Sequence, residues 1–418
     1  LNCIDSKTKF VTSHLFVDKR SLENCVKFLS QIKKTCYNQM FSRYFIKRVI
    51  GDDKRIVFVS DGFENYKNAF NKLFYRVAKL QFGVPIAAFQ LQQKKATAWA
   101  NTGYTVANEE FKLPWFNSNK SVVLNSDTLE ISEIANNISV KNKQFSLSIN
   151  KSTGFIDSYS INNKGKSVSL ISEPLQPHFW RAQTDNDRLG WLTHEELKFW
   201  KDAAKNIRLN KVNVEKDTDN EAHIVATFNI EDKVSFKIEY IIYGNGKVNI
   251  KLKFDADKSL PNIHRIGLKT SLSSNFDNVE FFGKGPFENY PDRNKGAMTD
   301  LYKGKVETFV ESYVRPQEQG NRTNIYWLTL SNDRQTGLKL TSDEQFNFSY
   351  QPWSTELLDK STHTYQLEKN GKLYLNIDFK LAGIGGNDTW SKNAAPLDKY
   401  QIKPGLYNFS INLNPQTK

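Results

Sequence analysis

The stretch VSFKIEYIIYGNGKVNIKLKF, residues 234–254, decides the fold class of this 418-residue chain. Over 234–240 and again over 248–254, apolar residues occupy every second position and polar or charged residues fill the positions between them. Side chains of a β-strand point alternately to its two faces, so the pattern predicts two strands, each with one buried and one solvated face. The glycines at 244–246 supply a turn, and the two strands should form an antiparallel hairpin.

The same alternation recurs at residues 145–149, 373–379 and 407–413. No succession of strand and helix patterns runs along the sequence, so a (β/α)8 barrel is not encoded here. The composition agrees, because 29 Phe against 2 Met favours strands over helices. The sequence therefore predicts a mainly β protein built as a large antiparallel sandwich.

The N-terminal segment follows another pattern. Apolar residues at three- and four-residue spacing over 21–49 predict an amphipathic helix, with Ser21 as its N-cap. We therefore expect a smaller domain, partly helical or a β-sandwich, before the large β domain.

Composition also bears on partners and location. The net charge is +13, but the basic residues of the N-terminal segment lie among apolar ones, so we expect no nucleic-acid partner. No apolar run approaches about 18 residues, so we expect no membrane partner. Cys3, Cys25 and Cys36 are odd in number and match no metal or redox spacing, which favours reduced thiols and a cytoplasmic location.

Three further stretches are typical of rigid polar loops: FWRAQTDND at 179–187, GKGPFENYPDR at 283–293 and GIGGNDTW at 383–390. Each combines aromatic, carboxylate, amide or arginine side chains with glycine or proline turns. Sugar-binding surfaces need that mixture. An aromatic face packs on the apolar face of a pyranose, while Asp, Asn and Arg bind its hydroxyls.

The order of these stretches, with RPQEQGNR at 315–322 between the second and third, resembles the C-terminal small-chain domain of the family 2 glycoside hydrolase β-galactosidases. The resemblance covers residues 125–418, and ATAWANTGY at 96–104 resembles the end of the β-sandwich domain that precedes it in that family. It implies a galactose mutarotase-like supersandwich over 125–418. Residues 1–115 would be a divergent remnant of the preceding domain, and 116–124 a linker.

The resemblance implies a component of a β-galactosidase that hydrolyses terminal β-D-galactosides such as lactose. In that family both catalytic glutamates and the magnesium ligands lie on a barrel, which this chain does not encode, so we expect no catalytic residue here and no activity of the chain alone. No cofactor is expected in this chain; magnesium and sodium are implied for the complete enzyme. The implied partners are the galactoside, a catalytic barrel domain or large subunit, and further copies in an oligomer.

The resemblance also implies site residues. Trp390 would reach the active site and stack on substrate, with Gly386 and Asp388 holding its loop. The alternative is a buried core tryptophan, the fate we expect of Trp180 and Trp327. Gly190 would be the hinge of a mobile loop.

Two alternatives stay open. The acidic run 185–187 suits either a metal or a turn with an arginine counter-charge, and we favour the turn, so no metal site is predicted. The chain could also act alone, as a carbohydrate-binding module or as a mutarotase-like epimerase with His178 and Glu318 as acid and base.

Overall fold

The computed structural model describes residues 2–4, 11–14, 30, 56–60, 78–82, 86–112 and 127–417. The chain divides into two compact units, Leu1–Val122 and Val123–Lys418. The boundaries drawn from the sequence, at residues 115 and 125, stay predictions. The helix expected over 21–49 lies outside the described residues, apart from Ser30, which is helical.

The described part of the first unit consists of paired strands. Its strands are β1 (Asn2–Ile4), β2 (Val11–His14), β3 (Ile56–Ser60), β4 (Ala78–Phe82), β5 (Ile86–Gln92) and β6 (Thr105–Lys112). β1 pairs with β2 and β5 with β6 in antiparallel fashion, whereas β3 and β4 are parallel. The stretch at 96–104 forms the connection between β5 and β6, where Trp99 lies edge-on to Tyr104 with ring centroids 5.5 Å apart.

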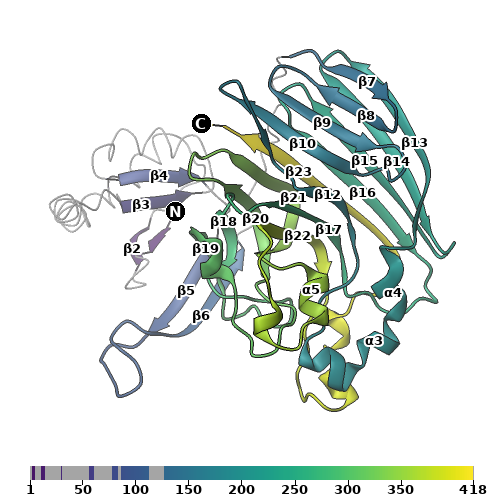
Figure 1. The fold of residues 1–418 in the computed structure, drawn as a ribbon. Helices are drawn as coiled ribbons and strands as arrows, with labels where there is room; N and C mark the ends of the chain where they lie inside the picture. The colour runs from purple at the N-terminus through teal and green to yellow at the C-terminus, as the bar shows by residue number, and fades with distance from the viewer. Residues whose placement is uncertain are drawn as a thin grey trace. The chain divides into compact units, whose positions relative to one another are not determined.

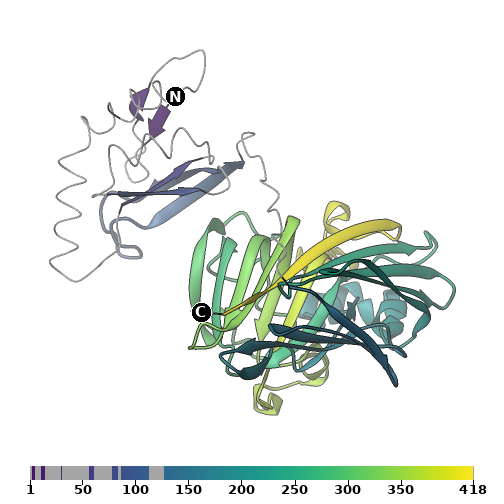
Figure 2. The same cartoon turned by 90° about the horizontal axis from the view of Figure 1, so that it is seen from above.

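The second unit is one antiparallel sheet that closes on itself; viewed from above, it curves round (Figure 2). Its strands are β7 (Glu130–Ile134), β8 (Asn137–Lys141), β9 (Phe145–Asn150), β10 (Ile156–Asn163), β11 (Lys166–Ser169), β12 (Glu173–His178), β13 (Ile207–Thr218), β14 (Glu221–Ile230), β15 (Val234–Tyr243), β16 (Val248–Ala256), β17 (Arg265–Ser273), β18 (Asn278–Gly285), β19 (Met298–Lys305), β20 (Arg322–Ser331), β21 (Gly337–Gln351), β22 (Lys372–Leu381) and β23 (Leu406–Gln416).

Helices are short and few among the described residues. They are the π-turn η1 (Asn186–Trp191), α3 (Thr193–Glu196), α4 (Lys198–Ala203), α5 (Thr355–Lys360) and the 3-10 turns η2 (Val306–Phe309), η3 (Thr364–Gln366), η4 (Lys392–Ala394) and η5 (Asp398–Tyr400). α3, α4 and α5 gather at one end of the sheet (Figure 1). Within the described residues, no helix has the length and apolarity needed to cross a bilayer.

The predicted hairpin is confirmed. β15 pairs with β16 so that Phe236 lies opposite Phe254 and Ile238 opposite Leu252. Burial alternates along both strands as the sequence requires, because inward residues enter the core and outward ones meet solvent. The other three predicted strands are confirmed as β9, β22 and β23, and so is the mainly β, antiparallel class.

The C-terminal strand β23 closes the sheet. Leu413 lies opposite Val248 of β16 on one side and opposite Leu340 of β21 on the other. A strand paired on both sides leaves no free backbone edge there. β23 therefore joins the β13–β16 meander to the strands that carry the polar loops.

Aromatic rings fill the core between these strands. Phe228 stacks on Phe236 with centroids 4.6 Å apart, and Phe179 lies 5.5 Å from Phe254. Trp180 is buried, as the sequence predicts. The expectation for Trp327 was wrong, because its ring is only partly buried and the Lys339 ammonium lies 4.7 Å from its centroid.

Neighbouring residues of β16 give a test of this architecture. Ile250 is 1% exposed and faces the core, whereas Lys251 points to solvent. Ile250→Ala should lower the free energy of unfolding by about 2–5 kcal/mol, because it removes buried methylenes and leaves a cavity. Lys251→Ala should change it by less than about 0.5 kcal/mol. Chemical denaturation measures both, and equal losses would contradict the assigned faces.

Candidate functional site

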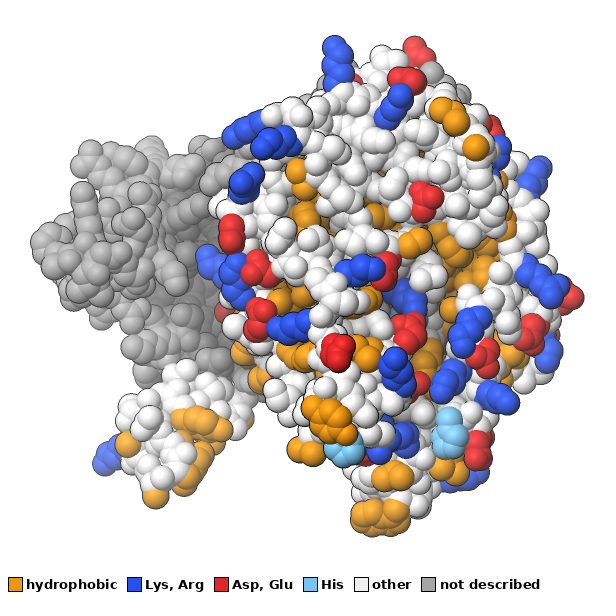
Figure 3. Space-filling view, viewed as in Figure 1, with side chains coloured by type: hydrophobic (Ala, Val, Ile, Leu, Met, Phe, Trp, Pro, Cys, Tyr) orange, Lys and Arg blue, Asp and Glu red, His pale blue; other side chains and the backbone are white. Residues whose placement is uncertain are grey.

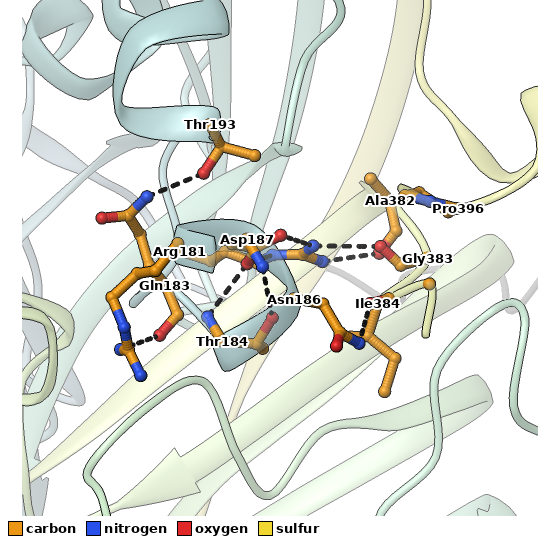
Figure 4. A network of polar contacts seen from close by, with 12 residues as sticks. Arg181, Gln183, Thr184, Asn186, Asp187, Thr193, Ala382, Gly383, Ile384 and Pro396 are labelled. Carbon is orange, nitrogen blue, oxygen red and sulfur yellow. Dashed lines mark hydrogen bonds and ion pairs between the residues drawn. The ribbon is translucent and has the colours of Figure 1, made fainter. Parts of the chain in front are cut away.

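Two polar loops leave the sheet at the same end. β12 ends at His178, opposite Gly267 of β17, and β22 ends at Leu381, opposite Arg265 of the same strand. Because β17 lies between them, the stretch after β12 and the stretch after β22 start as neighbours, although about 200 residues separate them. Figure 4 shows their polar contacts.

A buried ion pair joins the two loops. The Arg181 guanidinium donates to both carboxylate oxygens of Asp187, over 3.0 and 2.8 Å, and to the carbonyl oxygens of Ala382 and Gly383, over 2.9 and 3.0 Å. Both charged side chains are fully buried. Burial opposes ionisation of Asp187, but the adjacent Arg181 charge and its hydrogen bonds hold the pKa of that carboxyl below its ordinary value.

Local sequence sets the shape of the first loop. The Thr184 amide donates to Asp187 Oδ2 over 3.0 Å, and the Asp187 amide donates to Thr184 Oγ1 over 3.2 Å. This reciprocal pair resembles a capping box and starts the turn η1. The turn presents Asn186, whose Nδ2 donates to the carbonyl oxygen of Ile384 over 2.9 Å and whose Oδ1 accepts from Thr389 Oγ1 over 3.2 Å.

The second polar stretch supplies another anchor. Asp292 accepts hydrogen bonds from two consecutive backbone amides, those of Ile384 over 3.1 Å and Gly385 over 2.8 Å. In the same stretch, Glu288 is buried and accepts from Arg293 over 2.5 Å and from the Gly320 amide over 2.9 Å. All three quoted stretches therefore meet at, or directly support, the loop after β22.

The predicted residue Asp388 braces that loop from within. Its carboxylate accepts from the backbone amides of Trp390 and Ser391, over 3.2 and 3.0 Å, and from the Ser391 hydroxyl over 2.5 Å. The Ser391 hydroxyl bond is the main reason that the pKa of Asp388 lies below its ordinary value. Gly386 has a backbone φ of +110°, a conformation that residues with a side chain rarely adopt. A Cβ at this position would lie 3.0 Å from Asn186 Nδ2.

Trp390 itself is 80% exposed, in contrast to the buried Trp180. The core alternative for Trp390 is therefore wrong in this structure; its role in binding substrate stays a prediction. Beside the loop lies an open hollow of about 580 Å³, lined by residues that include Asn387, Asn393 and Gln401. In the space-filling view, side chains of both charge signs are interspersed over the face of the second unit (Figure 3).

Gly190, the predicted hinge, is buried at the end of η1. A Cβ there would lie 2.3 Å from the Ala394 Cβ and 2.5 Å from the Ser391 carbonyl oxygen. The absence of a side chain thus allows η1 to pack directly against the loop that carries Trp390. The hinge role stays a prediction.

His178 and Glu318, the proposed acid and base of an epimerase, are brought together but enclosed. Arg265 lies 3.3 Å from His178 Nδ1, 3.1 Å from a Glu318 oxygen and 3.1 Å from an Asp378 oxygen. All four side chains are buried. Burial raises the pKa of Asp378 to about 7, although Arg265 opposes this shift. Burial also raises the pKa of Glu318, although the charges of Arg265 and Arg181 oppose this shift.

His264, which the sequence reading did not single out, is also enclosed. Its ring stacks on Trp180 at 4.7 Å with the planes 3° apart and lies 5.4 Å from the ring of Trp191. Among the described residues, neither ring nitrogen has a hydrogen-bond partner. Burial lowers the pKa of His264 to about 3, and the charges of Arg181 and Arg265 act in the same direction. The Asp187 charge opposes this shift.

The two aspartates of the acidic run at 185–187 form ion pairs with arginines nearby in the sequence. Asp185 pairs with Arg188, and Asp187 pairs with Arg181. Within the described residues, no group of three or more His, Cys, Asp or Glu side chains is placed to hold a metal ion. The contacts of this run match the turn with an arginine counter-charge.

Asp292 and Asn186 are the residues whose role the sequence reading missed. Both lie inside the quoted stretches, yet they act on a loop that is 92 and about 200 residues further along the chain. The available signal was the coincidence of carboxylate and amide side chains in stretches that share one sheet end.

Comparison with known proteins identifies the family. The beta galactosidase small chain model matches residues 141–413, and the chain belongs to this family. Similar proteins include the β-galactosidases of Priestia megaterium, 31% identical over 74% of this chain and 30% of the relative, and of Halalkalibacterium halodurans, 30% identical over 64% and 26%. The chain thus spans under a third of these relatives. A galactose 1-epimerase structure from Lactobacillus acidophilus covers 69% of this chain and 98% of that one, at 8% identity and a TM-score of 0.40.

His264 gives a prediction for pH dependence. Between pH 6.5 and about 3 the unfolded chain binds a proton on this ring that the folded chain does not, so stability falls as pH decreases through this window. His264→Phe keeps an aromatic ring in the stack and removes the titrating imidazole, and with it this pH-dependent loss of stability. At pH 5 the variant should gain about 2 kcal/mol relative to wild type beyond any difference at pH 7.5. Denaturation at both pH values measures this, and a pH-independent difference would contradict it.

Proposed function

We propose that this chain is the C-terminal part or small subunit of a β-galactosidase that hydrolyses terminal β-D-galactosides such as lactose, and that it contributes Trp390 as a substrate-stacking residue. The exposed indole, on a loop anchored by two stretches from elsewhere in the chain, carries the proposal. The family match supports it. An aromatic ring held at a fixed place stacks on the apolar face of a galactose ring and so orients the glycosidic bond.

The carboxylates around the loop support a binding role and not a catalytic one. Retaining hydrolysis needs two carboxyl groups about 5 Å apart, one as nucleophile and one as acid and base. Here Asp187 is bound by Arg181, Asp292 by two backbone amides, and Asp388 by its own loop. Each is engaged in holding backbone, so the reacting carboxylates in this proposal come from a barrel domain or large subunit.

The proposal includes what the complete enzyme would need. A barrel domain or large subunit is the partner, and the assembled enzyme is an oligomer. Magnesium and sodium are part of the proposal for that assembly, as the family resemblance implies. The cytoplasmic location expected from the cysteine pattern remains part of the proposal.

The epimerase alternative is less well supported. Its acid and base candidates are both bound to Arg265 and are 2% and 3% exposed. The lining of the hollow beside the Trp390 loop includes lysine, amide and carboxylate groups but no histidine. A sugar ring that enters this hollow would meet no histidine to act as acid or base.

Complementation tests the proposal. The matched partner is the Priestia megaterium β-galactosidase from which the region matched by this chain has been deleted; below, this protein mixed with our chain is called the reassembled enzyme. Neither component alone should hydrolyse a chromogenic β-galactoside, whereas the mixture should. The deleted region added back is the positive control. Turnover on the order of 10 per second by the chain alone, or success of the control where this chain fails, would contradict the proposal. Acceleration of galactose mutarotation by the chain alone would favour the epimerase.

Trp390→Ala gives a second test in the reassembled enzyme. Loss of the stacking surface should raise KM for the galactoside about twofold to tenfold, since such aromatic contacts are worth about 0.5–1.5 kcal/mol. The stability of the chain should change by less than about 0.5 kcal/mol because the ring is exposed. Trp99→Ala is the control, as Trp99 is 66% exposed in the first unit. Equal KM values in the two variants would count against the stacking role.

A further inference from the structure

The indole of Trp390 has no hydrogen bond and no ring–ring contact with the described residues around it, and 80% of the residue's surface is exposed. Its place is therefore set by its loop and not by contacts of the ring. The loop between β22 and β23 contains only the short turns η4 and η5, so regular backbone hydrogen bonding does not hold it. A few backbone bonds, such as that from the Gly386 amide to the Ala394 carbonyl oxygen over 3.0 Å, tie the loop to itself. Side chains from elsewhere in the chain attach it to its surroundings.

We propose that Asp292 and Asn186 are positioning residues for the galactosidase reaction, which act by holding the Trp390 loop in its substrate-ready place. The inference rests on the proposed function for its consequence in catalysis, but the positioning itself is a property of this chain.

Asp292 fixes the start of the loop. Its two oxygens accept from the consecutive amides of Ile384 and Gly385, over 3.1 and 2.8 Å. A carboxylate that accepts two backbone amides constrains both the position and the orientation of that peptide. The contact is also close, because a Cβ on Gly383 would lie 2.4 Å from Asp292 Oδ2.

Asn186 ties the start of the loop to the residue that precedes Trp390. Its Nδ2 donates to the Ile384 carbonyl over 2.9 Å, and its Oδ1 accepts from Thr389 Oγ1 over 3.2 Å. Thr389 directly precedes Trp390, so one amide group fixes both sides of the turn. Asp388 completes the turn from within through the Trp390 and Ser391 amides.

The chemistry predicts which changes release the loop. Asp292→Asn replaces one acceptor oxygen by an NH2 group that would face a backbone N–H, so one of the two bonds is lost and two donors oppose each other. Asn186→Ala removes both of its bonds. Thr389→Val removes only the hydroxyl that meets Asn186 and keeps the shape of the side chain. Asp300→Asn is the control, because Asp300 is exposed and accepts only from the amide of the next residue in the described structure.

The first experiment uses the chain alone. The chain is labelled with 5-fluorotryptophan, and the ¹⁹F resonance of Trp390 is assigned among the eight tryptophans by Trp390→Phe. Asp292→Asn and Asn186→Ala should broaden or split this resonance and leave those of the buried tryptophans unchanged, with a smaller effect for Thr389→Val. An unchanged Trp390 resonance in all three variants would overturn the inference, whatever the reassembled enzyme does. If one variant fails to fold, Thr389→Val decides.

The second experiment is a double-mutant cycle in the reassembled enzyme. Asp292→Asn and Asn186→Ala should each raise KM about threefold to tenfold with a smaller change in kcat, and neither should have a further effect in the Trp390→Ala background. Effects that persist without Trp390 would show a general structural role and overturn the inference. If Trp390→Ala itself leaves KM unchanged, the stacking role fails, and the ¹⁹F result still decides the positioning.

Discussion

The buried contact of Arg181 with Asp187 and with two backbone carbonyls is the constraint on which the polar end of the molecule depends. Removing two charges from water is expensive, and a buried pair adds little net stability over an apolar replacement. What it supplies here is position. The planar guanidinium can satisfy the carboxylate and both carbonyls only when the loop after β12 and the loop after β22 lie at one separation and orientation.

That constraint works because the sheet has already brought the loops together. β17 pairs with both β12 and β22, and β23 pairs with both β16 and β21, so the strand ends cannot drift apart without breaking the closed ladder. Asp292, from the 283–293 stretch, then binds the loop after β22 from outside the β12–β17–β22 group. The scaffold is held by strand pairing and an apolar core, whereas the loops above it are held by polar contacts between side chains and backbone far apart in sequence.

This division explains how much could be predicted from the sequence. Strands such as β15 and β16 follow from a two-residue period that is visible within their own short stretches of sequence. The exposure of Trp390 agrees with its glycine-rich, polar sequence neighbourhood. The burial predicted for Trp327 was wrong, because the sequence of a strand does not tell how completely other elements cover its faces. Asp292 lay in a recognised stretch, but its partner amides are 92 and 93 residues away, and a backbone amide leaves no mark in a sequence. His264 was missed for a similar reason, since its environment is made by two tryptophans that only the fold brings near.

The same contacts separate the work of this chain from the chemistry of hydrolysis. A reacting carboxylate must be free to change its charge or its bond, whereas a carboxylate that holds backbone amides or an arginine is stabilised in its ionised form and resists both. The Arg181 charge lowers the pKa of Asp187, and the Ser391 hydroxyl, followed by backbone amides, lowers the pKa of Asp388. Such contacts favour a stacking role, because a sugar bound to a ring that is already fixed loses less of the binding free energy to ordering the protein. In the proposed function, the residues that hold this loop therefore serve to position Trp390, and the reacting carboxylates come from another domain.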